Sequence, residues 1–442
     1  HIAPSDRLDL RARYRVMREA AWVAGADATG AGRGFAAQAD LSALFIERSL
    51  ALLRPSGTLA LLVPAKLWRS LAGGGVRQLL LQDATLREVG DWTEGRSTFD
   101  AVVYPSLVVA SRTSDTASRP LVRVGVARRD RLLAWNARAD ALPIEASPGA
   151  PWALVPPDVR RDFERVARAG PPLASTAFGR PVLGVKTGCN DAFIVRVLEP
   201  APTAPHVPTR SGPADDSCRV VGQDATGAIE RALLRPLLRG DGLATWRHGA
   251  DDARIIWTHD ATGDPLDRLP PAAVDWLRPW SRRLATRTDA QGRGPWWQLF
   301  RTEAASMNRP RVVWGDIGRA PRASVVPSGD PAVPLNSCYV LFAPTEDDAH
   351  ALATLLNAPP LVAWLRMIAE PARGGYHRFL GWTVARLPIP RDWSGAVERL
   401  APIGRAAAAG APPDAATLTA AVLACYHIRP RDVSALLTWT HS

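Results

Sequence analysis

Glycines and charged side chains are the first places to look for chemistry in this sequence of 442 residues. The run Thr29–Phe35, TGAGRGF, has the composition of a loop that could hold a phosphate group. A nucleotide-binding loop follows an apolar strand. Here the preceding run Ala21–Gly25 is too short for such a strand and is soon interrupted by Asp27. We therefore interpret TGAGRGF as a mobile linker between structured elements.

Several classes of catalytic centre are excluded by spacing. Lys66 and Lys186 are the only lysines, and the residues two positions before them are Pro64 and Gly184, so a nuclease centre of the acid-x-Lys type is absent. The sequence has no G-x-S-x-G, H-E-x-x-H or Gly-Lys-Ser/Thr pattern, which removes serine hydrolases, zincins and P-loop proteins. No C-x-x-C pair or histidine ligand spacing occurs, so we predict four ordinary thiols and no metal site. The cysteines are Cys189, Cys218, Cys338 and Cys425.

The charge is strongly positive and is carried almost entirely by arginine. The formal net charge is +11, with 54 basic residues. Arginine presents a planar fork that pairs with phosphates and with guanine edges, so this excess favours a nucleic acid as partner. A GC-rich coding bias would also replace lysine by arginine. Apolar runs stay far below the roughly 20 residues of a membrane span, so we expect no membrane partner.

The elements that would position a site begin with an α/β region at residues 1–112. Residues 40–53 have apolar side chains at helical spacing, and Asp40 is placed to cap that helix. The continuous apolar run 58–63 is typical of a strand buried on both faces of a parallel sheet. Alternating helices and apolar strands predict an open α/β sheet. Further predicted elements there are a helix at 76–82 and strands at 86–92 and 101–110.

The remaining chain divides into three predicted parts. Residues 113–175 form a connecting segment with a strand at 121–127 and a helix near 157–169. Residues 176–392, rich in tryptophan, arginine, glycine and proline, form a mixed α/β domain of short strands. Residues 393–442 form a tail of alanine-rich helices.

Three runs in the first region carry a family resemblance. DLSALFIERSLALLRPSGTLALLVPAKLWRS (40–70), VRQLLL (76–81) and STFDAVVYPSLVVAS (97–111) resemble the central part of the catalytic domain of adenine-specific DNA methyltransferases that use S-adenosylmethionine. The γ-type enzymes of restriction-modification systems, including the fused type IIG proteins, are the nearest in pattern. The resemblance implies a partial Rossmann-like sheet and S-adenosylmethionine as cofactor. It places Asp40, Leu41 and Phe45 on the cofactor side of the site.

Phe99 is the predicted catalytic-site aromatic. Methylation of a base amino group requires the base to leave the duplex, and the extruded base needs an aromatic face for stacking. Phe99 precedes a buried strand and would lie at the rim of the sheet, where sites of α/β proteins form. Alternatively, Phe99 fills the core.

The resemblance continues into the second domain. GVKTGCNDAFIV (184–195), LLRPLLRGDGLATW (233–246), PLNSCYVLF (334–342), LATLLNAPPLVAWL (352–365) and GGYHRFLGWTVARLPIP (374–390) look like successive parts of a target-recognition domain. This implies double-stranded DNA as partner. The predicted DNA-contact residues are Lys186, Thr187, Asn190, Arg235, Arg239, Arg373, Tyr376 and Arg378. For each arginine a solvated surface role is equally open, and the tryptophans are expected to pack the domain.

Two elements of the family pattern are missing. One is the glycine turn that holds the methionine part of the cofactor, and the other is the Asn/Asp-Pro-Pro-aromatic motif that accepts hydrogen bonds from the adenine amino group. None of the five Pro-Pro pairs has the required neighbours. We expect the chain to be the C-terminal portion of a bacterial, cytoplasmic methyltransferase, inactive alone, that works with its upstream part. The alternative is a DNA-specificity module that acts with separate catalytic subunits.

Overall fold

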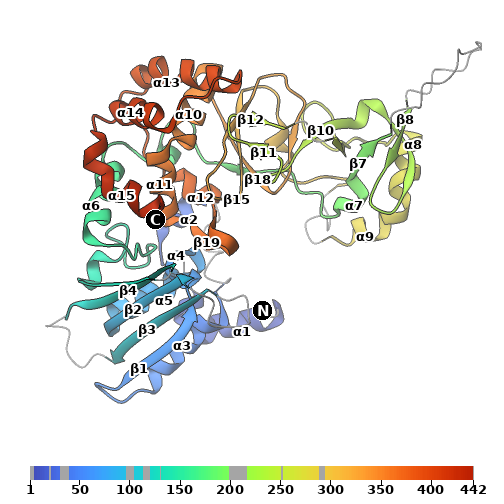
Figure 1. The fold of residues 1–442 in the computed structure, drawn as a ribbon. Helices are drawn as coiled ribbons and strands as arrows, with labels where there is room; N and C mark the ends of the chain where they lie inside the picture. The colour runs from blue at the N-terminus through green and yellow to red at the C-terminus, as the bar shows by residue number, and fades with distance from the viewer. Residues whose placement is uncertain are drawn as a thin grey trace, which may run out of the picture.

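A computed structural model describes residues 4–18, 21–29, 39–95, 104–112, 120–129, 131–198, 217–249, 252–287 and 294–441. Phe99 and the TGAGRGF residues after Thr29 lie outside the described residues, as does the side chain of Arg373. The protein is mixed α/β with a helical C-terminal region, which confirms the predicted fold class. Figure 1 shows a first sheet at one end of the molecule and a strand-rich lobe at the other.

The first sheet has five strands in the order β1-β3-β2-β4-β5. The β2 and β4 strands are parallel, and the other neighbours are antiparallel. Because β4 and β5 belong to this sheet, it extends beyond residue 112 into the predicted connecting segment. The strands are β1 (Thr58–Pro64), β2 (Ala84–Gly95), β3 (Pro105–Arg112), β4 (Val122–Arg129) and β5 (Arg131–Ala137).

The strand expected to be buried on both faces, β1, is instead an edge strand. It pairs only with β3 among the described residues, and that pairing is antiparallel. Leu59 and Val63 are buried, whereas Leu62 on the opposite face is 57% exposed. The prediction was wrong because a continuous apolar run does not show whether another layer covers each face.

Helices α3 (Leu41–Leu52) and α5 (Gly74–Gln82) pack against this sheet. The Asp40 carboxylate caps α3 by accepting a hydrogen bond from the Ser42 amide, as predicted for a helix N-cap. Arg77 of α5 is fully buried. Its guanidinium donates to the carbonyl oxygens of Leu67, Ser70 and Gly149 at 2.6–3.1 Å and thereby fixes the turn that follows β1.

The strand-rich half contains three main sheets. A six-stranded sheet has the order β17-β10-β13-β7-β8-β9, a four-stranded sheet β16-β14-β18-β6, and a three-stranded sheet β15-β20-β19. Their strands are β6 (Val182–Leu183), β7 (Ile194–Val197), β8 (Ser217–Val221), β9 (Thr226–Glu230), β10 (Leu234–Leu238), β13 (Ala253–Ile256), β14 (Arg311–Gly315), β15 (Ile317–Gly318), β16 (Ser324–Val326), β17 (Val333–Pro334), β18 (Cys338–Phe342), β19 (Glu370–Ala372) and β20 (Tyr376–Arg378).

The residues predicted as a helical tail are packed into the protein. Helices α13 (Trp393–Ala408), α14 (Ala415–Cys425) and α15 (Ser434–His441) share one core with α6 (Pro157–Arg168), α10 (Glu346–Asn357) and α11 (Pro359–Ile368). The Asp162 carboxylate in α6 accepts hydrogen bonds from the Ala435 and Leu436 amides at the start of α15. Among the described residues no single helix is both long enough and apolar enough to cross a membrane. Helices α10 and α11 meet these two criteria only when they are taken together, and the bend between them is 67°.

Candidate nucleic-acid interface

A cleft lies between the first sheet and the β19–β20 hairpin, and its larger compartment has a volume of about 500 Å³. One wall comes from the ends of β2 and β4, the other from the hairpin and α11, and α15 closes one side. Four arginines and two carboxylates are among the described residues that line it, which leaves two more positive than negative charges. They are Arg69, Arg128, Arg319, Arg366, Asp91 and Glu94.

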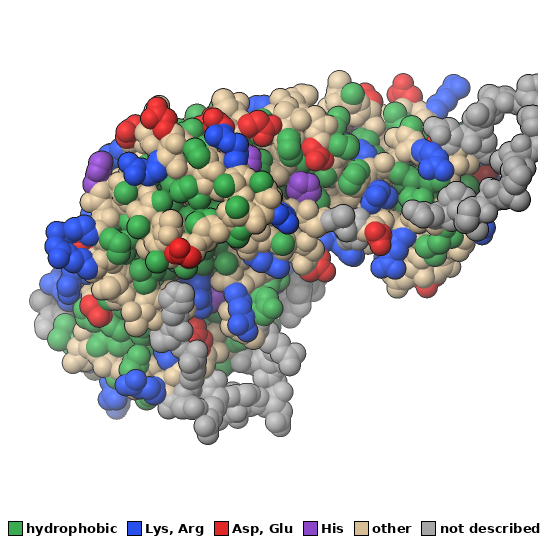
Figure 2. Space-filling view, turned by 45° about the horizontal axis from the view of Figure 1, so that its top comes forward, with side chains coloured by type: hydrophobic (Ala, Val, Ile, Leu, Met, Phe, Trp, Pro, Cys, Tyr) green, Lys and Arg blue, Asp and Glu red, His purple; other side chains and the backbone are tan. Residues whose placement is uncertain are grey.

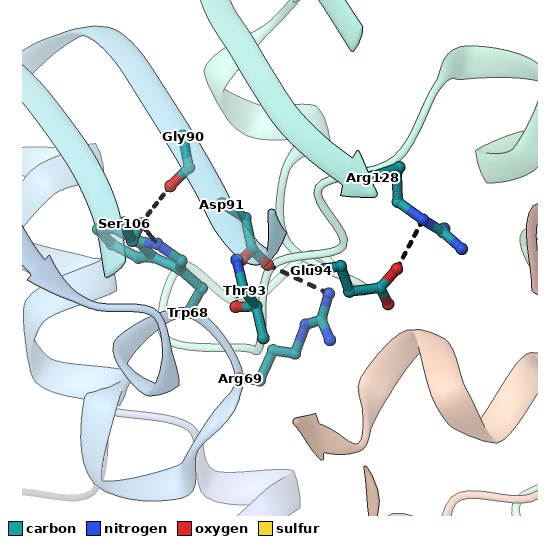
Figure 3. Close-up of polar contacts among 8 residues, drawn as sticks. All are labelled: Trp68, Arg69, Gly90, Asp91, Thr93, Glu94, Ser106 and Arg128. Atoms are coloured by element: carbon teal, nitrogen blue, oxygen red, sulfur yellow. Dashed lines mark hydrogen bonds and ion pairs between the residues drawn. The ribbon is translucent and has the colours of Figure 1, made fainter. Parts of the chain in front are cut away.

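The sheet wall presents two ion pairs (Figure 3). Arg69 lies 3.4 Å from the Asp91 carboxylate, and Arg128 lies 2.7 Å from the Glu94 carboxylate. Asp91 also accepts hydrogen bonds from the amide and hydroxyl of Thr93, which fixes the direction of its side chain. The carboxylates therefore hold two guanidinium groups at the cleft edge of the sheet.

Trp68 supports this wall from inside the protein. Its indole N–H donates to the Ser106 hydroxyl, which in turn donates to the Gly90 carbonyl of β2 (Figure 3). The Trp68 ring stacks on Trp152, with 5.0 Å between the ring centroids. Because Arg69 follows Trp68 directly in the short helix α4 (Lys66–Arg69), this packing determines where Arg69 emerges.

The opposite wall is the end of the β19–β20 hairpin. Tyr376 is 41% exposed, whereas His377 beside it is 4% exposed. The exposed Arg319 guanidinium lies 5.8 Å from the centroid of the Tyr376 ring. Arg366 projects from α11 and donates a hydrogen bond to the Thr440 carbonyl of α15.

Burial and the arginines determine the protonation of this wall. Burial lowers the pKa of His377 to about 3, and the nearby positive charges of Arg366, Arg69 and Arg128 act in the same direction. The imidazole is therefore neutral at pH 7. Burial also lowers the pKa of Arg366, while Glu94 opposes that effect. At the base of the hairpin, burial of the Glu370 carboxyl group raises its pKa.

Of the predicted cofactor residues, Leu41 and Phe45 lie on α3, and Asp40 is the N-cap of that helix. Leu41 and Phe45 are 47% and 70% exposed and present an apolar surface onto which an adenine ring could pack. The Asp40 carboxylate is already engaged by Ser42 and by Lys66, whose ammonium lies 2.6 Å away. The cofactor contact of Leu41 and Phe45 stays a prediction, whereas the Asp40 carboxylate caps α3.

The predicted DNA-contact residues separate into two groups. Tyr376 and Arg378 lie on the exposed hairpin, and Arg373 lies in its turn. The other predicted residues lie in the strand-rich half. The backbone of Lys186 pairs with that of Phe300, and Arg239 follows β10. Asn190 begins the short helix α7 (Asn190–Phe193).

Two of the predicted DNA-contact residues in the strand-rich half make hydrogen bonds inside the fold. Thr187 is 2% exposed, and its hydroxyl bonds to Asn190 and to the Cys189 amide. The Arg235 guanidinium donates to the Pro331 and Ala305 carbonyls and lies over the Trp257 ring at 4.4 Å. This geometry does not support the DNA contacts predicted for Thr187 and Arg235, because their polar groups are occupied inside the fold.

Sequence reasoning missed most of the cleft. Asp91 and Glu94 could have been found as polar residues at the end of an apolar strand, where α/β sites form. Arg366 is the single charge in an apolar helix, which is also a usable signal. Nothing local distinguishes Arg69 or Arg128 from the many other arginines.

Lys and Arg side chains also lie outside the cleft. Figure 2 shows the molecule hollowed between its two ends, with Lys and Arg side chains along part of that border. Asp and Glu side chains lie along the same border. The excess of arginine over carboxylate belongs to the cleft itself, and a cationic cleft suits a polyanion.

Sequence comparisons find one matching family model and one relative. Residues 25–99 match the family model of the Eco57I restriction-modification methylase. The Type II methyltransferase M.PaeR7I of Pseudomonas aeruginosa is 26% identical over 385 residues, which cover 82% of this chain and 60% of that protein. The chain thus spans less than two thirds of the length of this relative.

One solved structure shares the fold of this chain. The Type IIL restriction-modification enzyme MmeI, solved in complex with DNA, superposes with a TM-score of 0.57 at 10% identity, covering 99% of this chain and 52% of its own. The type IIG restriction endonuclease BpuSI gives a TM-score of 0.36 at 10% identity over 90% of this chain and 48% of its own. The matched domain and the relative thus make this chain similar to restriction-modification methyltransferases, and the first solved structure shares its fold.

Proposed function

We propose that the protein containing this chain is a site-specific DNA adenine N6-methyltransferase. The observation that supports this proposal most is the arginine-rich cleft between a methyltransferase-type sheet and a hairpin of the strand-rich half. Base-modifying enzymes must accommodate an extruded nucleotide beside its duplex, and a cleft of about 500 Å³ lies within the range of small-molecule sites. Relatives named as a Type II methyltransferase and as a DNA-bound restriction-modification enzyme support this proposal.

S-adenosylmethionine would supply the methyl group. Leu41 and Phe45 offer apolar surface for its adenosine part. The described residues of this chain would bind the duplex and keep the target strand at the sheet edge. Arginines at the cleft would neutralise backbone phosphates, since guanidinium groups pair with phosphate in a fork geometry. Phe99 would stack on the extruded adenine. Since the bacterial chromosome is the substrate, the proposal places the protein in the cytoplasm.

The proposal is tested by expressing the full-length protein in a bacterial host that lacks adenine methylation and sequencing its DNA for N6-methyladenine. We expect methylation at one recurrent sequence. An Arg366→Gln variant should methylate less, whereas Arg161→Gln, on the exposed face of α6, is the matched control. Methylcytosine at the site would overturn adenine specificity, and specific binding without methylation would favour the DNA-specificity module.

A further inference from the structure

Tyr376 has an unusual setting for a large aromatic residue. It is 41% exposed and lines the larger compartment of the cleft. Aromatic side chains are normally covered, because their burial is strongly favourable. The pairing of its backbone with Ala372 fixes the start of β20 but leaves the ring outside the core.

The base of the hairpin is held firmly. His377 is buried and pairs through its backbone with both Pro371 of β19 and Gly318 of β15. Just beyond β20, the Phe379 amide donates to the Asp316 carbonyl, and the Phe379 carbonyl accepts from the Trp314 indole, both at 2.8 Å. The exposed ring therefore projects from a fixed support.

The turn before Tyr376 provides open space around the ring. Gly374 and Gly375 have φ values of +74° and +75°, which favour glycine over residues with a side chain. A Cβ atom added at Gly375 would meet nothing within 4 Å, and one at Gly374 would lie 3.6 Å from the Tyr376 ring. The two glycines thus add no side chain beside the ring.

Charge around the ring suits a nucleic acid. Arg319 lies at 5.8 Å from the Tyr376 centroid, and Arg366 and Arg128 line the same compartment. An aromatic projection among guanidinium groups can enter a base stack while the cations hold the flanking phosphates. We propose that Tyr376 inserts into the DNA duplex and fills the place that the target base vacates, an inference that rests on the proposed function.

The test compares a paired with a mismatched target. The recognition sequence comes from the methylation map, or from selection out of random duplexes if the protein binds without methylating. Binding of the full-length protein is measured by fluorescence anisotropy on a paired duplex and on one with a mismatch at the target position. Extrusion is followed by the fluorescence of 2-aminopurine at that position.

Tyr376→Ala should weaken binding to the paired duplex about tenfold to one hundredfold, the range of one lost stacking contact. It should also abolish the 2-aminopurine signal. A mismatch already weakens the target pair, so it should restore most of the lost affinity. Tyr376→Phe keeps the ring and should behave like the native protein.

Arg319→Ala is the matched control, because a lost phosphate contact weakens both duplexes equally. If Tyr376→Ala also weakens both duplexes equally, or if it retains the 2-aminopurine signal, the inserted ring is refuted while DNA recognition stands. If the native protein binds no selected duplex, both this inference and the proposed function fail.

Discussion

Acid should destabilise the protein through His377. The side chain is 4% exposed, and burial beside three arginines lowers its pKa to about 3 from an ordinary value of 6.5. In the unfolded chain the imidazole binds a proton as the pH falls through 6.5, whereas the folded protein keeps it neutral. The unfolded state therefore binds more protons between pH 6.5 and pH 3, and stability falls with pH across this window.

The size of the effect follows from linkage. Each pH unit in this window changes the free energy of unfolding by about 1.4 kcal/mol. Lowering the pH from 7.5 to 5 should therefore remove about 2 kcal/mol through His377 alone, a large part of the 5–15 kcal/mol typical of a folded domain. His377→Leu and His377→Gln carry no titrating group at this position. Both variants should therefore lose about 2 kcal/mol less than the native protein over the same interval.

The assay is urea unfolding followed by tryptophan fluorescence at pH 7.5, 6.5, 5.8 and 5. His427→Gln removes an exposed histidine and serves as the control. The two His377 variants will differ from each other in absolute stability, because leucine and glutamine pack differently. Their pH dependence is the quantity compared. If both variants keep the native slope below pH 6.5, the buried neutral imidazole is not the origin of the acid sensitivity.

Three further predictions concern DNA binding, the core and catalysis. Arg366→Gln should lower the slope of log affinity against log salt by about 0.9, the value for one phosphate contact, and Arg161→Gln should leave it unchanged. Arg77→Met strands the buried carbonyl oxygens of Leu67 and Gly149 at about 1–3 kcal/mol each, offset in part by removal of a buried charge. It should lower the free energy of unfolding by about 2–5 kcal/mol, and a loss below about 0.5 kcal/mol in urea titration would contradict the role given to Arg77. Phe99→Ala should reduce the methylation rate of the full-length protein, and undiminished methylation would contradict base stacking.

Part of the fold could be predicted because apolar runs identify individual strands. The runs at 58–63 and 86–92 correspond to β1 and β2. Strand β5 was missed although five of its seven residues are apolar, because so short an apolar run does not distinguish a strand from part of a helix. Pairing was also beyond reach, since β3 lies between β1 and β2 in the sheet and that order depends on contacts distant in sequence.

The candidate site was only partly accessible to sequence reasoning, for a geometric reason. Tyr376 and Arg378 could be named because both lie in one continuous run, residues 374–390, that resembles part of a target-recognition domain. Arg69, Glu94 and Arg366 come from separate elements and meet only in the folded protein. Thr187 was named as a DNA contact because it is polar. In the fold its hydroxyl makes internal hydrogen bonds to Asn190 and to the Cys189 amide.

The position of α15 bears on how the protein is synthesised. Trp439 and Thr440 line the cleft, and the Arg128 guanidinium lies over the Trp439 ring at 4.4 Å. These contacts join residues about 300 positions apart, so they form late when a ribosome releases the chain from its N-terminus. The cleft stays open on one side until α15 docks. A nascent chain would thus carry all four cleft arginines before translation reaches α15, and the wall that this helix forms would be added last.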